Sequence, residues 1–556
     1  MTSTGSRLAG RIPLLVALAA AGLGIVLVFI MPRGLFSGDE GVKLLQSRAL
    51  VENGWRSAAI PYPGQDIDPR QKYLPLRPPF VWEHEGSWYG VYSLTYTAAT
   101  ALAWALGGLR AVSLFSWSGA ALGLVLLAGL AKKALGWPWA TAVVVMTALA
   151  TPLLLYGTLN FEHSWATALV LGCLLLLTLP EPNGRSQVIA GALLGLGAVI
   201  RPELYAFPAG IVAFCLVGWG WRRQTIRRLV FVAAGMILVT GIDLVSRALM
   251  FGSFHPNLQV GDLPATTYAL NLNRLVPPEI TGRGAATLAA AVLIGLMPVR
   301  GATSRVARWL AGLILVLVFG HLSWQALAAV TPSVRADTRT VIGLFGATPL
   351  ALVGLLRGVT ARKSEESRLA AACAAAAAVF IVAVVAVKVR GFIGGLELGS
   401  RYLLPAAPLL LIGAADYLRR QTPGLQRGLT AAACMLLAVL SLRASLDNAV
   451  STYVIRQDNA RLVTAVRESG IEDVITRHFW IPQLMAPIYF EKRIYLNPDR
   501  RLLRRMVRAE RYRVVGVDLR AGVYSGRNLR LIRGRVGLRP GRVISYRLLT
   551  PQEQSP

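Results

Sequence analysis

The stretch IPLLVALAAAGLGIVLVFIM, residues 12–31, contains no charged residue, and PRGLFSGDEG, residues 32–41, follows it directly. A helix needs about 20 mostly apolar residues to cross a bilayer, because each backbone N–H and C=O must find its partner within the segment. The run is longer than the apolar core of a secretory signal peptide, and Pro32-Arg33-Gly34 is a poor cleavage site. We therefore expect a retained membrane anchor.

Similar apolar stretches recur as far as Leu442, and 54% of the 556 residues are hydrophobic while only 15% are charged. Soluble globular proteins are about one quarter charged, so this composition places the chain among membrane proteins. We predict an all-α polytopic membrane protein with about 13 transmembrane helices. The predicted spans are approximately residues 12–31, 110–131, 138–156, 162–180, 186–200, 203–220, 228–250, 284–299, 306–328, 340–357, 368–388, 401–418 and 428–445.

The orientation depends on residues 91–108, which are apolar enough to span but rich in Tyr, Thr and Ser. If this segment does not cross, Arg7, Arg11 and most basic residues of the short loops face the cytoplasm, as the positive-inside rule requires. If it does cross, that bias inverts. We therefore predict a juxtamembrane helix at 91–108, a first outer loop over 32–109, and a multi-pass protein of the cytoplasmic (inner) membrane with a cytoplasmic N-terminus.

The composition changes after Ser451, where short apolar runs such as 474–476 and 514–517 alternate with helical patterns. We predict a transmembrane module over residues 1–450 and a small C-terminal α/β domain over 451–556. Thirteen crossings would place this domain outside the cytoplasm, and long domains are translocated largely regardless of their charge.

The chain carries 58 Lys and Arg against 28 Asp and Glu, a formal net charge of +30. In a soluble protein such an excess would indicate a nucleic-acid partner. Here much of it lies in short loops between spans, where basic residues fix orientation, and there is no nucleic-acid-binding motif. We expect membrane lipids as partners, and no nucleic acid.

Carboxylates gather on the predicted outer side, beginning with Asp39 and Glu40 directly after the first span. The glycines that flank them allow a sharp turn, which would bring both side chains to the bilayer surface, where a carboxylate could act as a base. The alternative is that the two acids only cap the following helix, since negative charge favours a helix N-terminus.

Two further groups lie in the outer loops. Glu83-His84-Glu85 precedes several aromatic residues, and Glu162-His163 stands at the start of a predicted span. Either pair could position a substrate or bind a divalent cation such as Zn²⁺. Adjacent residues on a helix diverge by about 100°, which weakens the metal interpretation for Glu162 and His163. An ordinary solvated loop is the alternative for Glu83 and His84, so a divalent cation is a candidate cofactor only.

Arg201, in Arg-Pro-Glu, and Arg401, followed by Tyr402, each lie at the outer end of a predicted span. A guanidinium is permanently charged and can bind phosphate oxygens with two parallel hydrogen bonds, which suits a lipid phosphate at headgroup level. The alternative is that the side chains reach toward ordinary headgroups. His255, which begins another outer loop, is a further candidate for positioning substrate.

These residues together resemble the GT-C class of membrane glycosyltransferases, especially the branch with the lipid A aminoarabinose transferase and the protein O-mannosyltransferases. The resemblance covers about residues 12–445, and the features that carry it are Asp39-Glu40, the segment 91–108, the acidic loop at Glu162, GLGAVIRPE over residues 195–203 and RYLLP over residues 401–405. The chain lacks the Arg-Tyr that commonly follows the acidic pair in the aminoarabinose branch.

The resemblance implies a polyprenyl-phosphate-linked sugar as donor and a lipid, glycan or protein acceptor on the outer face of the membrane. Asp39 would be the general base, and the reaction would invert the anomeric carbon. Arg201, Arg401 and Tyr402 would bind the donor phosphate. Two other functions remain open: a transporter or flippase of a lipid-linked saccharide, and a glycan ligase or polymerase with a pyrophosphate-linked donor.

Overall fold

The computed structural model describes residues 11–78, 80–179, 183–252, 343–357, 365–386, 398–421, 424–509, 513–519 and 529–535. His255 and the predicted spans at 284–299 and 306–328 lie outside these residues.

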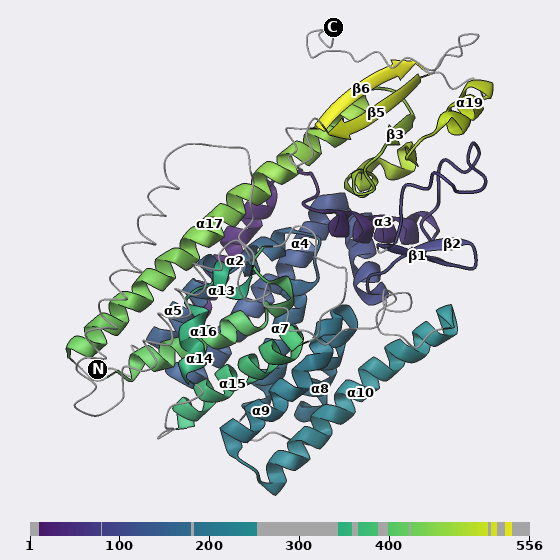
Figure 1. Cartoon of the computed structure of the whole chain (residues 1–556). Helices are drawn as coiled ribbons and strands as arrows, with labels where there is room; N and C mark the ends of the chain where they lie inside the picture. Colours follow the sequence, from purple (N-terminus) through teal and green to yellow (C-terminus); the bar gives the residue numbers. More distant parts are fainter. Residues whose placement is uncertain are drawn as a thin grey trace.

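The apolar stretches among the described residues fold as helices that lie side by side in a bundle (Figure 1). Among the described helices, six are long and apolar enough to cross a membrane, and three more are apolar but shorter. The helical class of the fold is thus confirmed, whereas the number of crossings and the orientation stay predictions. The helices of the bundle are α2 (Ile12–Ile30), α4 (Leu94–Leu135), α5 (Trp137–Leu149), α6 (Leu153–Thr158), α7 (His163–Leu177), α8 (Gly184–Ile200), α9 (Phe207–Trp219), α10 (Arg223–Phe251), α13 (Leu344–Ala347), α14 (Ala351–Arg357), α15 (Glu365–Ala386), α16 (Ala406–Arg419) and α17 (Leu425–Glu468).

Helix α4 is kinked at the boundary between the predicted juxtamembrane segment and the predicted second span. Gly107 and Gly108 leave helical geometry there, and Gly108 has φ 61° and ψ −150°, a conformation that is essentially restricted to glycine. The helix therefore has two parts with different directions, and residues 94–106 do not continue the line of the span that follows.

Several predicted spans are broken by proline close to the predicted outer rim. The segment 138–156 is two helices, α5 and α6, which separate before Pro152. The segment 401–418 begins as a 3₁₀ turn, η5 (Arg401–Leu403), and becomes helix α16 only after Pro405. Proline has no N–H and disfavours helical geometry in the residue before it, so these helices end or begin there. The breaks bring irregular backbone to the rim, where it carries the candidate site.

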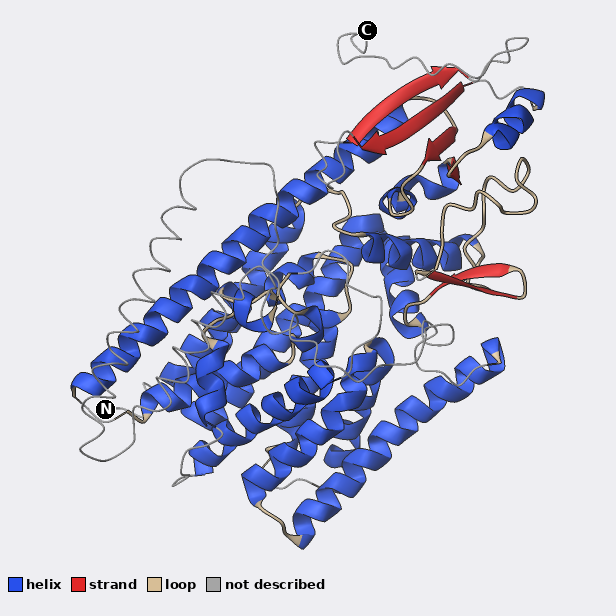
Figure 2. Ribbon diagram, viewed as in Figure 1, coloured by secondary structure: helices blue, strands red, loops and turns tan. Residues whose placement is uncertain are grey.

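The C-terminal part contains a four-stranded sheet in the order β4-β3-β5-β6, seen at one end of the bundle (Figure 2). The strands β3 (Asp473–Thr476), β4 (Arg493–Leu496) and β5 (Arg513–Leu519) are parallel, and β6 (Leu529–Arg535) is antiparallel to β5. Helices α18 (Ile481–Leu484) and α19 (Arg500–Arg508) and the 3₁₀ turn η6 (Ala486–Glu491) lie between strands. A small C-terminal α/β part is thus confirmed.

The link between the bundle and this sheet is α17, a helix of 44 residues. In Figure 1 it runs along the bundle and reaches the sheet with its C-terminal end. The predicted domain boundary at residue 450 falls inside this helix, so the division into two domains stays a prediction. The predicted first outer loop packs on the same region: helix α3 (Gly38–Glu52) lies between bundle and sheet, and the hairpin of β1 (Val81–His84) and β2 (Ser87–Gly90) lies beside α3.

Candidate functional site

Helix α3 carries the acidic pair and lies across the ends of the bundle helices (Figure 1). Its capping side chain is Ser37, whose Oγ accepts a hydrogen bond from the Glu40 N–H at 3.5 Å. Asp39 and Glu40 occupy the first turn, where negative charge is favoured, yet both are buried, with 6% and 0% of their surface exposed. Burial of two carboxylates requires specific partners, which the alternative of simple capping does not supply.

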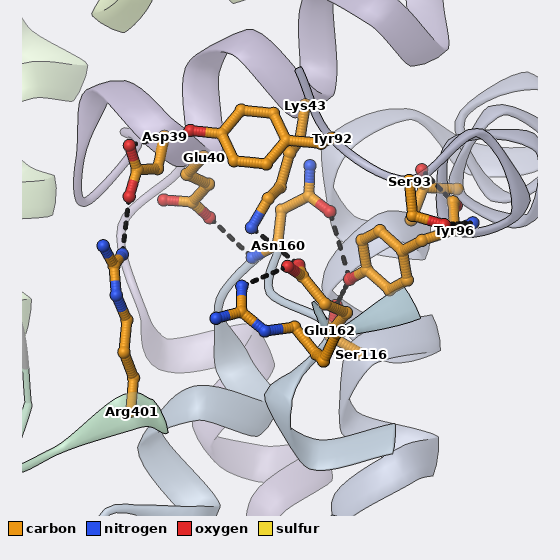
Figure 3. A network of polar contacts seen from close by, with 12 residues as sticks. Asp39, Glu40, Lys43, Tyr92, Ser93, Tyr96, Ser116, Asn160, Glu162 and Arg401 are labelled. Atoms are coloured by element: carbon orange, nitrogen blue, oxygen red, sulfur yellow. Dashed lines mark hydrogen bonds and ion pairs between the residues drawn. The ribbon is translucent and has the colours of Figure 1, made fainter. Parts of the chain in front are cut away.

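Asp39 has two such partners, drawn in Figure 3. Its Oδ2 lies 2.5 Å from Nη1 of Arg401, and its Oδ1 accepts a hydrogen bond of 2.8 Å from the Tyr92 hydroxyl. Burial raises the pKa of Asp39, but Arg401, Lys43 and the hydrogen bond from Tyr92 together lower it by more, so the pKa lies below its ordinary value. Asp39 is therefore ionised at neutral pH, which is the state a general base needs.

The three residues predicted to bind a donor phosphate lie together. The Arg401 guanidinium donates to the Tyr402 hydroxyl at 3.1 Å and lies 5.1 Å from the centre of that ring. Arg201, at the C-terminal end of α8, lies 5.4 Å from the centre of the same ring. Tyr402 thus contacts both arginines. Their role toward phosphate stays a prediction.

Arg201 is held by two carboxylates. Its Nη1 lies 2.7 Å from Glu162 Oε1, and its Nε lies 2.8 Å from Glu203 Oε1. Glu162 comes from the loop between α6 and α7, so its pair with Arg201 joins two bundle helices at the rim. An arginine with two carboxylate neighbours keeps its charge in a buried position.

Lys43 is a residue of this site that the sequence analysis did not single out. Its Nζ lies 2.6 Å from Glu162 Oε2, and it lies over the rings of Phe161 and Tyr92 at 4.2 and 4.6 Å. Burial lowers the pKa of Lys43, and the opposing effect of Glu162 does not restore its ordinary value. Lys43 follows Asp39 by four residues on α3, so helical spacing alone could have placed both on one face.

Glu40 contacts main chain rather than a cationic side chain. Its Oε2 accepts from the Phe36 N–H at 2.5 Å and its Oε1 from the Asn160 N–H at 2.8 Å. Glu40 therefore holds together the loop before α3 and the loop that carries Glu162. Its predicted catalytic role stays a prediction.

Glu162 and His163 have different surroundings, as their adjacent positions predict. Glu162 faces Lys43 and Arg201, whereas the His163 ring stacks on Tyr156 with ring centres 5.0 Å apart. No group of three or more His, Cys, Asp or Glu side chains arranged for a metal occurs in the described ranges. Because both oxygens of Glu162 lie against cations and His163 faces away from them, this pair does not fit a divalent metal ion.

The other predicted pair lies on the hairpin of the first outer loop. Glu83 is exposed on β1, and the His84 ring contacts Trp82 and Phe251, with ring centres 5.4 and 5.6 Å away. These contacts place His84 in an aromatic group separate from the contacts of Asp39 described above. A part for Glu83 or His84 in substrate positioning remains a prediction.

The site thus combines buried carboxylates and cations from α3, the α6–α7 loop, the end of α8 and the start of η5. No protein-family model and no curated protein matches the sequence. Among solved structures, the chain is similar to ArnT from Cupriavidus metallidurans bound to undecaprenyl phosphate, with 13% identity, a TM-score of 0.48 and 93% of each chain covered.

The chain is also similar to an oligosaccharyltransferase from Archaeoglobus fulgidus in the apo form, with 14% identity and a TM-score of 0.48 over 90% of this chain and 69% of that one. A structure of AglB from the same organism, in complex with an inhibitory peptide and a dolichol-phosphate, gives 15% identity and a TM-score of 0.46 over 91% and 69%. The chain is thus similar to solved structures of ArnT and of archaeal oligosaccharyltransferases.

Proposed function

We propose that the protein is a membrane glycosyltransferase that moves a sugar from a polyprenyl-phosphate donor to an acceptor hydroxyl or phosphate on the outer face of the cytoplasmic membrane. The observation that carries this proposal is the position of Asp39: a buried, ionised carboxylate 2.5 Å from Arg401, in a cluster that also contains Arg201 and Lys43. A base beside several cations is the combination that this transfer requires.

The cations suit the departing phosphate. Arg201, Arg401 and Lys43 come from three separate elements, and each is buried at the rim that carries the first outer loop. Positive groups fixed where negative charge develops stabilise that charge strongly, because water is largely excluded. A phosphate leaving group has a low pKa, so it can depart without a general acid.

Asp39 would take the proton of the acceptor as its oxygen attacks the anomeric carbon. The bond from that carbon to the phosphate oxygen breaks in the same step, and a single displacement inverts the configuration. Arg401 would contact both the base and the leaving group. It is paired with Asp39 in this structure, and it would also bind the phosphate when the donor is present. Sharing Arg401 raises the pKa of Asp39 and makes it a stronger base at the moment when donor is present.

The experiment is turnover of a polyprenyl-phospho-sugar by the purified protein in liposomes, with Asp39→Asn as the test variant. Asparagine keeps the shape but cannot accept the proton, so turnover should fall by about 10²–10⁴-fold. Asp447→Asn is the matched control, because Asp447 is a half-exposed aspartate of α17 whose partner is Arg443. Unchanged turnover in Asp39→Asn would refute the assignment of the base.

The same liposomes separate the alternatives. A flippase would move the intact saccharide lipid across the membrane without breaking the bond to phosphate. A ligase or polymerase would consume a pyrophosphate-linked donor and leave the monophosphate donor untouched. Either result would refute the proposed reaction.

A further inference from the structure

One buried cation in this region touches none of the candidate catalytic groups. Arg456 lies in α17, far along the chain from the first loop, and only 3% of its surface is exposed. Its guanidinium donates to three main-chain carbonyls: from Nε to Pro32 at 2.9 Å and Gly34 at 2.8 Å, and from Nη1 to Thr158 at 2.8 Å. A buried charge is costly even though the Glu40 carboxylate interacts with it electrostatically, so such an arrangement calls for a reason.

The three carbonyls belong to the two segments that lead into the site. Pro32 and Gly34 lie in the short loop between α2 and α3, a few residues before Asp39. Thr158 ends α6, and the chain continues from it to Glu162. Arg456 therefore ties together the segments that carry the two carboxylates facing the cations.

Three further contacts support the same connection. The Asn459 side chain, one turn further along α17, donates to the Leu35 carbonyl at 2.7 Å. From the other side, Glu40 accepts from the Phe36 N–H and the Asn160 N–H, which belong to the same two segments. Arg456 thus binds their carbonyls while Glu40 binds their amides.

Gly34 shows how closely the first segment lies on α17. A Cβ at this position would overlap the main-chain carbonyl oxygen of Arg456 and would come within 2.5 Å of the Ala460 nitrogen. Only glycine allows this approach without a shift of backbone. The loop before α3 is therefore set directly against the helix that leads to the C-terminal sheet.

We propose that Arg456 is a positioning residue, which together with Glu40 fixes Asp39 relative to Glu162 and the cations around them. This inference rests on the proposed function, since it concerns the geometry of that reaction. In this proposal α17 fixes the two segments through Arg456, and Glu40 has a positioning role.

The first experiment measures position without any chemistry. In Arg456→Met the three carbonyls lose their donor, and amide hydrogen exchange should become at least tenfold faster both at 35–44 and at 158–164. Arg461→Met is the matched control, because Arg461 lies on the same helix with 70% of its side chain exposed. Unchanged exchange in Arg456→Met, or faster exchange in only one segment, would refute the connection.

The second experiment measures turnover in the wild type, Arg456→Met and Arg456→Lys. We expect kcat of Arg456→Met to fall at least about 30-fold per folded molecule while the KM for donor changes less than about threefold, with partial recovery in Arg456→Lys. The acid limb of the pH profile should move to higher pH, since a displaced Asp39 is less well paired with Arg401. An ordinary structural role would lower the yield of folded protein and leave kcat, and the pH limb of what folds, unchanged.

If Arg456→Met does not fold, Arg456→Lys weakens the same contacts without removing the charge, and it should speed exchange in both segments, whereas Asn459→Ala, which removes only the contact with Leu35, should speed exchange at 35–44 alone. The two proposals can fail separately. A wild type that never turns over the donor defeats the proposed function, while the exchange experiment still decides whether Arg456 joins the two segments. A turnover-competent wild type with an unaffected Arg456→Met defeats the positioning role alone.

Discussion

Asp39 and Arg401 are 362 positions apart in the sequence, yet Oδ2 of one lies 2.5 Å from Nη1 of the other in a buried ion pair. The pair joins α3 of the predicted first outer loop to the turn that begins the α16 segment. Removal of one partner of such a pair leaves an unneutralised charge in a site with little water. The proposed base and a proposed phosphate ligand therefore depend on each other before any substrate arrives.

Arg401→Gln should lower stability and change its pH dependence. Loss of one partner from a buried pair costs about 3–5 kcal/mol. In the wild type the pKa of Asp39 is depressed on folding, so its stabilising contribution is present above the unfolded pKa and is lost as pH falls through the lower folded value. In the variant that pKa rises toward or above the unfolded value, so the acid-dependent loss should shrink or reverse, and the stability difference between variant and wild type should narrow as pH falls. Thermal unfolding at pH 7 and pH 5 measures both effects.

Arg443→Gln is the control for that measurement. Its pair with Asp447 is half-exposed at 3.0 Å, and exposed pairs contribute at most about 1 kcal/mol. Equal losses of stability in the two variants, with no difference in their pH dependence, would show that the buried Asp39–Arg401 pair stabilises the protein no more than an exposed pair does.

Lys43 should produce an alkaline limit on donor binding. Burial holds the pKa of Lys43 below the usual 10.5, so the side chain loses its charge at lower pH than an exposed lysine. Loss of that charge removes one cation from the cluster around Glu162, and the KM for donor should rise. Lys43→Met should show the raised KM, by about tenfold, at every pH. Lys72→Met, a change in an exposed pair with Asp499, should leave the profile as it is.

Gly34→Ala should lower the stability of the protein, although it adds only a single methyl group. The added Cβ meets main-chain atoms of α17, which cannot move aside as a side chain could. Overpacking of this kind costs about 1–3 kcal/mol, and the displaced loop should also lower turnover. Gly22→Ala provides the control, because nothing lies within 4 Å of a Cβ at that position in α2. Wild-type stability and activity in Gly34→Ala would show that the loop has room to shift.

The sequence was sufficient for the described helices and for part of the cluster, since it missed Lys43 and grouped Glu83 and His84 with residues from which they lie apart. Long apolar runs leave little alternative to helices. Asp39, Arg201 and Arg401 were predicted together because the charge pattern of the loops puts all three at one face of the membrane. The proline breaks could also have been predicted from Pro152 and Pro405, since the residue before a proline disfavours helical geometry.

The partners could not be predicted. Several carboxylates and several cations lie close together at this end of the bundle. Arg401 pairs with Asp39, and both Lys43 and Arg201 pair with Glu162. This choice of partners depends on the directions of the side chains in three dimensions, which the sequence does not give. Arg456 shows a further limit. It lies in a long helix whose pattern gives no sign that its guanidinium binds carbonyls of loops more than 290 positions away.

Glu162→Gln tests whether a phosphate can bind the two cations that Glu162 neutralises. Glu162 neutralises Lys43 at 2.6 Å and Arg201 at 2.7 Å, and glutamine removes that charge while keeping the shape. Without ligand, the two buried cations repel one another and the melting temperature should fall.

A phosphate bound at the same cations would restore the missing negative charge. We therefore expect polyprenyl phosphate in liposomes to raise the melting temperature of Glu162→Gln by more than it raises that of the wild type, because a ligand stabilises a protein in proportion to its affinity for the folded state. Glu366→Gln, which alters a half-exposed pair with Arg419, should respond to the lipid as the wild type does. An equal shift in all three proteins would place the phosphate away from Lys43 and Arg201, and the proposed donor site would have to be abandoned.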